Sequence, residues 1–180
     1  MNIPNFLTLL RIILVPVIVI FLIQDEYLKA LIAFAIAGLT DALDGTLARL
    51  LNKQTELGAF LDPLADKLLI STCFISLSIF KLIPGWLTVI VISRDLIIFM
   101  GIMTLSMMSI KYEIKPVFIS KITTTLQIAT VFFALFLKIY TSDIISHNLI
   151  QILSWLTASF TILSGLAYII KGIQFLNRSS

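Results

Sequence analysis

Residues 41–66 read DALDGTLARLLNKQTELGAFLDPLAD, which sets four aspartates at fixed intervals inside a very apolar chain. Carboxylates in so hydrophobic a segment are costly to bury unless an opposite charge compensates them. The simplest compensation is a divalent cation, and oxygen-only ligands favour Mg, Mn or Ca over zinc. The stretch therefore predicts a metal site between helices of a membrane protein.

The composition indicates a membrane domain. The chain has 180 residues, of which 59% are hydrophobic and 13% charged, and its mean hydropathy is +1.06. Apolar runs of roughly 18 or more residues fit membrane-spanning helices, and the runs lack the polar face of a soluble amphipathic helix. We expect an all-α integral membrane protein, built as a single domain over residues 1–180, with no nucleic-acid partner.

Six transmembrane helices are expected, joined by short loops. We place them at residues 6–23, 28–51, 57–80, 85–108, 117–140 and 147–175. One side of the predicted topology carries Arg11, Arg49, Lys53, Lys111, Lys115, Lys121, Lys171 and Arg178, and the other side carries Lys29, Lys81 and Lys138. We expect the protein in the inner (cytoplasmic) membrane of the cell. The excess of positive charge on one side predicts that both termini and the aspartate motif face the cytoplasm.

The aspartates fall on two consecutive helices. Asp41 and Asp44 share one helix face because residues three apart are neighbours there, and Asp62 and Asp66 do so at a spacing of four. A short turn joins the helices, so we expect antiparallel neighbours whose faces meet. The four carboxylates would then converge on one small volume, where divalent ions turn their mutual repulsion into attraction.

Small residues and an arginine accompany the aspartates. Gly45 and Ala48 leave room for a nucleotide against the helix, and Gly58 allows the two helices to approach at the turn. Arg49 can donate two parallel hydrogen bonds to a phosphate. Gly45 and Ala48 alone would also fit plain small-residue packing between helices. Together with the aspartates, they predict a site for a phosphorylated nucleotide.

At these residues the chain resembles the CDP-alcohol phosphatidyltransferase family, whose signature is D-x2-D-G-x2-A-R-x8-G-x3-D-x3-D. Every fixed position is matched, by Asp41, Asp44, Gly45, Ala48, Arg49, Gly58, Asp62 and Asp66. The six-span layout and the opening at residues 2–8, NIPNFLT, are similar to bacterial phosphatidylglycerophosphate synthases.

The resemblance implies a metal-dependent transfer of a phosphatidyl group from CDP-diacylglycerol to an alcohol, with release of CMP. Asp41, Asp44 and Asp62 would hold Mg (or Mn), as two ions, around the diphosphate. Asp66 would share a metal and act as general base on the acceptor hydroxyl. The CDP moiety would be bound by Gly45, Ala48, Arg49 and Gly58. The family also implies a homodimer.

The sequence indicates the acceptor alcohol less specifically than it indicates the nucleotide and metal site. Glycerol 3-phosphate needs a basic pocket, and the candidate residues are Arg94, Lys121, Lys111, Lys115 and Arg11. The alternatives are a structural pair between neighbouring helices for Arg94, which precedes Asp95, and an interfacial anchor for Lys121.

One departure from the pattern favours a different acceptor. Phosphatidylglycerophosphate synthases usually show Arg-Glu and a second arginine two turns on, whereas this chain has Arg94-Asp95 and then Gly101. Residues 92–95 and 115–121 resemble mitochondrial-type cardiolipin synthases, which use phosphatidylglycerol. Glycerol 3-phosphate remains the leading expectation, with cardiolipin synthase as the alternative. A cation transporter is the third alternative, and it is based only on acids within the spans.

Overall fold

The structure is a computed structural model. It describes the backbone of residues 3–51, 56–107, 118–141 and 143–179, and the side chains of residues 8–40, 64–101, 103, 118–141, 147–172 and 174. All the secondary structure in this part of the chain is helical. The predicted all-α fold with six helices is therefore confirmed.

The helices begin and end close to the positions predicted from the apolar runs. They are α1 (Ile3–Ile23), α2 (Tyr27–Leu51), α3 (Glu56–Ile79), α4 (Gly85–Met107), α5 (Phe118–Tyr140) and α6 (Asp143–Ser179). Pro84 immediately precedes α4, where proline is tolerated because the first amides of a helix have no partner within it. The largest departure is α6, which extends beyond the predicted 147–175 at both ends.

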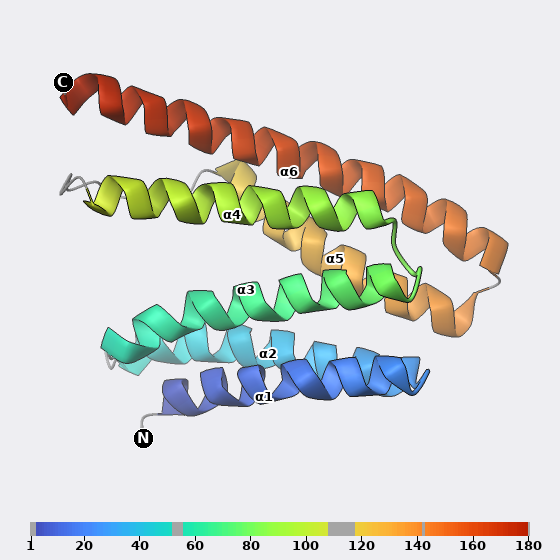
Figure 1. Cartoon of the computed structure of the whole chain (residues 1–180). Coiled ribbons are helices and arrows are strands. Elements are labelled where there is room, and N and C mark those ends of the chain that lie inside the picture. The colour runs from blue at the N-terminus through green and yellow to red at the C-terminus, as the bar shows by residue number, and fades with distance from the viewer. Residues whose placement is uncertain (1–2, 52–55, 108–117, 142, 180) are drawn as a thin grey trace.

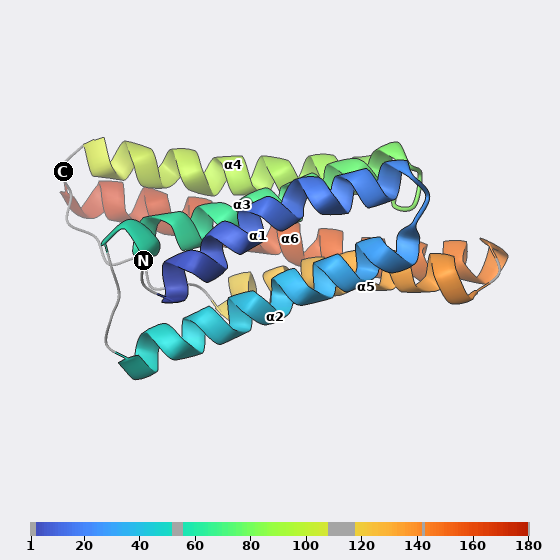
Figure 2. The same ribbon diagram turned by 90° about the horizontal axis from the view of Figure 1, so that it is seen from below.

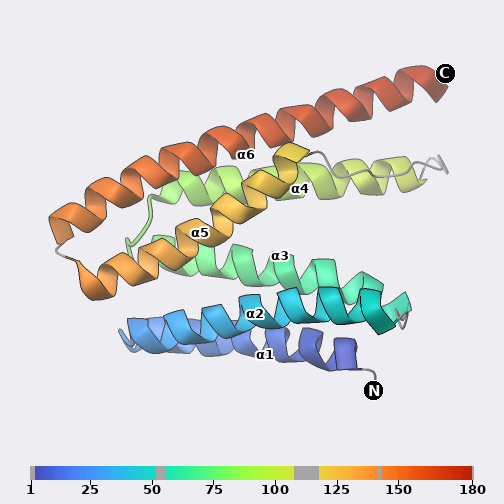
Figure 3. The ribbon, with the colours of Figure 1, turned by 180° about the vertical axis from the view of Figure 1, so that it is seen from behind.

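The bundle consists of two groups of three helices. α1 packs against α2 and α3, and α6 packs against α4 and α5, while α2, α3, α4 and α5 join the two groups. α1 begins and α6 ends at one end of the bundle, and the α1–α2, α3–α4 and α5–α6 turns lie at the other (Figure 1). α5 crosses in front of α4 at an angle when the bundle is viewed from the back (Figure 3).

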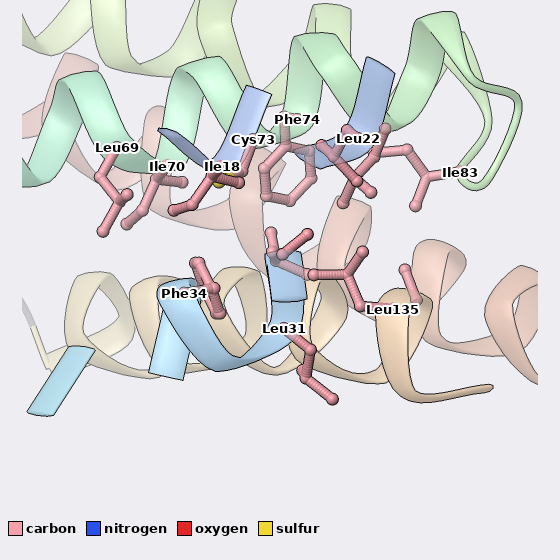
Figure 4. Close-up of a cluster of buried hydrophobic side chains, with 14 of the residues drawn as sticks. Ile18, Leu22, Leu31, Phe34, Leu69, Ile70, Cys73, Phe74, Ile83 and Leu135 are labelled. Carbon is pink, nitrogen blue, oxygen red and sulfur yellow. The ribbon is translucent and has the colours of Figure 1, made fainter. Parts of the chain in front are cut away.

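The hydrophobic core lies between these two groups. Ile18 and Leu22 of α1, together with Phe74 of α3, point toward one another, and Leu135 of α5 closes the cluster from the other side (Figure 4). Phe74 is fully buried. This core fixes α1, α3 and α5 against one another, so it sets the position of the aspartate-bearing helices.

The outer surface of the bundle is apolar. Large hydrophobic side chains with at least 60% exposure occur on several helices, namely Ile13, Ile23, Leu39, Ile79, Val89, Phe99, Met100, Phe118, Tyr140, Ile152 and Trp155. In the described part of the chain, α5 and residues His147–Gly172 of α6 are long and apolar enough to cross a membrane. Thr8–Ile23 and Tyr27–Thr40 are apolar but shorter.

Polar side chains form a seam inside the bundle instead. α5 buries Thr123, Gln127 and Thr130, and α6 buries Ser154, Thr157, Thr161 and Ser164. The hydroxyls of Thr130 and Thr157 hydrogen-bond across the two helices at 2.8 Å, and Thr123 donates to the carbonyl of Phe160 at 3.0 Å. Such polar contacts hold helices together where the surroundings offer no hydrophobic driving force.

The sequence predicts that α2 and α3 are antiparallel neighbours whose aspartate-bearing faces meet. α1 contacts both helices, whereas α2 and α3 make no extensive contact with each other among the described residues. Seen from below, α2 diverges from α3 toward the end where the aspartates lie (Figure 2). The side chains of residues 41–63 lie outside the described residues, so the expected meeting of the two aspartate faces stays a prediction.

Candidate active site

The aspartate motif lies at the end of the bundle where α1 begins. Asp41 and Asp44 fall in the C-terminal half of α2, and Asp62 and Asp66 in the N-terminal half of α3. The side chains of Asp41, Asp44 and Asp62 lie outside the described residues, as do those of Gly45, Ala48, Arg49 and Gly58. The backbone thus brings both halves of the motif to one end of the bundle, and Asp66 is the aspartate whose contacts can be described.

Asp66 forms an ion pair with Arg11. The guanidinium Nη1 of Arg11, on α1, donates to Oδ1 of Asp66, on α3. Arg11 is fully buried, whereas 39% of the Asp66 side chain is exposed. A buried arginine needs such an anionic partner because an unpaired charge in an apolar bundle is costly. The pair fixes the carboxylate on its buried side while leaving part of it open to solvent.

The next residue along α3 joins a second ionic network. Lys67 Nζ lies 2.5 Å from Oδ1 of Asp95 on α4. The same oxygen accepts a hydrogen bond from Nη1 of Arg94 at 2.7 Å. Since Asp66 and Lys67 are adjacent, α3 is tied at one level to α1 on one side and to α4 on the other.

The guanidinium of Arg94 also contacts α5 and α6. Its Nη2 donates to Ser120 Oγ at 2.6 Å and to Ser164 Oγ at 2.8 Å. The ring centroid of Tyr168 lies 5.8 Å from its Cζ, within the range of a cation–π contact. Only 5% of the Arg94 side chain is exposed. Arg94 therefore pairs with Asp95 of its own helix, and its contacts with the neighbouring helices are hydrogen bonds to serine hydroxyls and the ring of Tyr168.

The other residues predicted to bind the acceptor do not belong to the ionic network around Arg94. Lys121 is exposed at the start of α5, and Lys111 and Lys115 lie outside the described residues. Arg11, also a candidate, contacts Asp66 rather than standing open to a ligand. A role of these residues in binding the acceptor stays a prediction.

Sequence reasoning did not single out Ser164 and Tyr168 as partners of Arg94. One signal could have found the serine: Ser154, Thr157, Thr161 and Ser164 recur every three or four residues on α6, which marks one polar face of an otherwise apolar helix. Ser120 begins the matching face of α5. The seam therefore ends at Arg94.

The described side chains contain no group of three or more His, Cys, Asp or Glu residues arranged to hold a metal ion. Of the four aspartates predicted to bind metal, only Asp66 is among these described side chains. The donor set itself is all-oxygen, the chemistry that Mg and Mn prefer. The partly exposed Asp66 carboxylate fits the edge of such a site, because exposure gives an ion a route from solvent.

Comparison with known proteins defines the class. Residues 1–163 match the CDP-alcohol phosphatidyltransferase family. The chain belongs to this family, as the aspartate signature indicated. This membership leaves the cation-transporter hypothesis without support, since that hypothesis had no basis beyond acids within the spans.

Curated relatives of two kinds are similar to the chain. A cardiolipin synthase (CMP-forming) of Homo sapiens is 38% identical over 93% of this chain, and the match spans 60% of the human protein's length. A CDP-diacylglycerol–glycerol-3-phosphate 3-phosphatidyltransferase of Bacillus subtilis is 35% identical over 99% of both chains. One of the same name from Aquifex aeolicus is 33% identical over 86% of this chain and 92% of its own.

The network around Arg94 yields a stability prediction. Asp95→Asn removes the anion that compensates a buried arginine, so we expect the free energy of unfolding to fall by about 3 kcal/mol. The measurement is reversible unfolding of the purified protein in detergent micelles.

Lys29→Gln is the matched control because its ion pair with Glu26 is largely exposed. It should change the unfolding free energy by less than about 1 kcal/mol. Equal effects of the two substitutions would show that the Arg94 network adds no more than a surface pair.

Proposed function

We propose that the protein is a membrane-embedded phosphatidyltransferase. It transfers the phosphatidyl group of CDP-diacylglycerol to the hydroxyl of glycerol 3-phosphate and releases CMP. The observation that carries this proposal is the complete aspartate signature on two consecutive helices. The chain also aligns over 99% of its length with the CDP-diacylglycerol–glycerol-3-phosphate 3-phosphatidyltransferase of Bacillus subtilis. The chain acts as one domain.

Membrane embedding is supported by the distribution of polarity. Large apolar side chains face outward, while arginine, glutamine, serine and threonine side chains are buried. This pattern suits a hydrocarbon surrounding better than water, in which large exposed apolar patches are unfavourable. We place all six helices in the inner membrane, with the aspartate end toward the cytoplasm, where nucleotide-activated substrates are found.

Asp66 acts as the general base. Its carboxylate accepts the proton of the acceptor hydroxyl, the freed oxygen attacks the β-phosphorus, and the bond between that phosphorus and the CMP oxygen breaks. The contact with Arg11 holds one carboxylate oxygen in place, so the base is oriented before the acceptor arrives. Partial exposure of the Asp66 side chain lets an acceptor reach it from the aqueous end.

The remaining motif residues bind the nucleotide and its counter-ions. Asp41, Asp44, Asp62 and Asp66 would hold Mg (or Mn), as two ions, which neutralise charge on the phosphates when bound. Arg49 grips a phosphate, and Gly45, Ala48 and Gly58 leave room for CDP. We also propose a homodimer, an expectation that rests on the family alone.

A second acceptor is favoured by the contacts of Arg94. Both of its terminal nitrogens are engaged by Asp95, Ser120 and Ser164. An arginine bound in this way has little capacity left for a phosphomonoester dianion. The less highly charged phosphodiester of phosphatidylglycerol would need fewer free cations, so cardiolipin synthesis is the alternative activity.

The base role predicts the effect of Asp66→Asn. We expect CMP release from CDP-diacylglycerol to fall at least about 100-fold, since general-base catalysis contributes on this scale. The measurement is CMP formation by purified protein with magnesium and acceptor. Asp25→Asn, in the exposed α1–α2 turn, is the control and should retain full activity. Undiminished turnover by Asp66→Asn would remove Asp66 from the reaction.

An acceptor panel separates the two activities. Glycerol 3-phosphate and phosphatidylglycerol are each supplied with CDP-diacylglycerol, with inositol 1-phosphate and serine as controls. The leading proposal predicts CMP release at least about tenfold faster with glycerol 3-phosphate than with any other alcohol. Product from phosphatidylglycerol alone would assign the protein to cardiolipin synthesis.

A further inference from the structure

A glutamine side chain inside the bundle forms no hydrogen bond with the described part of the chain. Gln127 lies near the middle of α5 and is fully buried. Neither its Oε1 nor its Nε2 has a partner among the described residues. Arg94 and Asp95 each leave one buried atom without a partner there, but both residues pair through their other atoms. The proposed transfer reaction makes no use of Gln127.

A buried carboxamide is costly when its hydrogen bonds to water are not replaced. Its oxygen can accept two hydrogen bonds, and its NH₂ group can donate two. The cost is larger in an apolar bundle surrounded by hydrocarbon, where no bulk water reaches the group. Most buried polar side-chain atoms in proteins have a partner, which can be an ordered water. The burial of Gln127 therefore points to a small polar ligand.

Gln127 lies between two direct links from α5 to α6. Thr123 and Thr130 share its face of α5, because they are four residues before it and three residues after it. Thr123 donates to the carbonyl of Phe160 at 3.0 Å. The hydroxyls of Thr130 and Thr157 are hydrogen-bonded at 2.8 Å. Hydroxyl oxygens have two lone pairs, so these threonines retain acceptor capacity beside the carboxamide.

The interior limits the size of a ligand at Gln127. The next buried residues along α5 are Val131, Ala134 and Leu135, which belong to the hydrophobic core. Threonine side chains flank the carboxamide on its other side, and they are shorter than the leucines of the core. A fully enclosed polar site of this kind suits a water molecule, which occupies about 30 Å³.

We propose that the Gln127 carboxamide binds an internal water molecule between α5 and α6. Nε2 donates to the water oxygen, and the water donates to a hydroxyl of α6, where Thr157 and Thr161 are fully buried. Internal waters typically make about three hydrogen bonds to buried polar groups, and this seam supplies that number. The water joins the two direct links into one network. The inference is independent of the proposed transfer reaction.

Water-edited solid-state NMR provides the direct measurement. Full-length protein labelled with ¹³C and ¹⁵N is placed in lipid bilayers, and magnetisation is transferred from water to nearby side chains. We expect the Gln127 side-chain amide to receive this magnetisation at short mixing times. Gln24, which is exposed, is the hydrated control, and Phe74, which is fully buried in the core, is the dry control. Loss of the signal in Gln127→Met assigns it.

The stability of Gln127→Met gives a second test, in which the sign of the effect decides. A carboxamide bonded to water contributes to stability, so its replacement should raise the unfolding equilibrium constant about twofold to tenfold. A carboxamide without any partner is destabilising, so the same replacement would lower that constant. Gln24→Met, at an exposed position, is the matched control and should change the constant by less than about twofold.

Two results would overturn the proposal. If the Gln127 amide receives no more magnetisation from water than Phe74 does, the site is dry. If Gln127→Met unfolds less readily than the wild type, the carboxamide has no partner in the native protein. The NMR measurement uses the wild type, so it decides the question even where the methionine variant fails to fold.

Discussion

The arrangement of the helices depends on one constraint, which is that an ionised side chain inside an apolar bundle needs a partner. Arg11 meets it through Asp66, and Arg94 meets it through Asp95. The two ion pairs are connected through α3, where the consecutive residues Asp66 and Lys67 contact Arg11 of α1 and Asp95 of α4. Charge pairing thus links α3 to α1 of its own group and to α4 of the other group, and this places the candidate general base.

The polar interior and apolar exterior have a common cause. A helix in hydrocarbon gains no hydrophobic free energy by turning its apolar side chains inward, so polar contacts and small residues mark the faces between helices. The Ser/Thr seam between α5 and α6 follows this rule and ends at Ser164 beside Arg94. The same seam that joins these helices therefore also positions the guanidinium of Arg94.

Much of the fold could be predicted because the apolar runs and their breaks are local features. The helix bounds follow from them, and Pro84 marks the start of α4. The identity of the family could be predicted from the aspartate spacing alone. Both kinds of information are contained in short stretches of sequence.

The contacts between distant residues could not be predicted in the same way. Arg11 and Asp66 are 55 residues apart, and Arg94 and Ser164 are 70 apart. No periodicity specifies such a pairing, and the placement of α1 against both α2 and α3 depends on packing of the whole bundle. For the same reason the sequence marks Arg11 as a candidate for binding the acceptor but does not predict that its guanidinium contacts Asp66.

The central claim is that the carboxylates of α2 and α3 work by holding a divalent cation beside the pyrophosphate. The most direct test is CMP release from CDP-diacylglycerol by the wild-type protein, first in EDTA and then after magnesium is restored. A carboxylate-held metal predicts that release stops in EDTA and recovers fully with magnesium. Release that continues at the full rate in EDTA would contradict it.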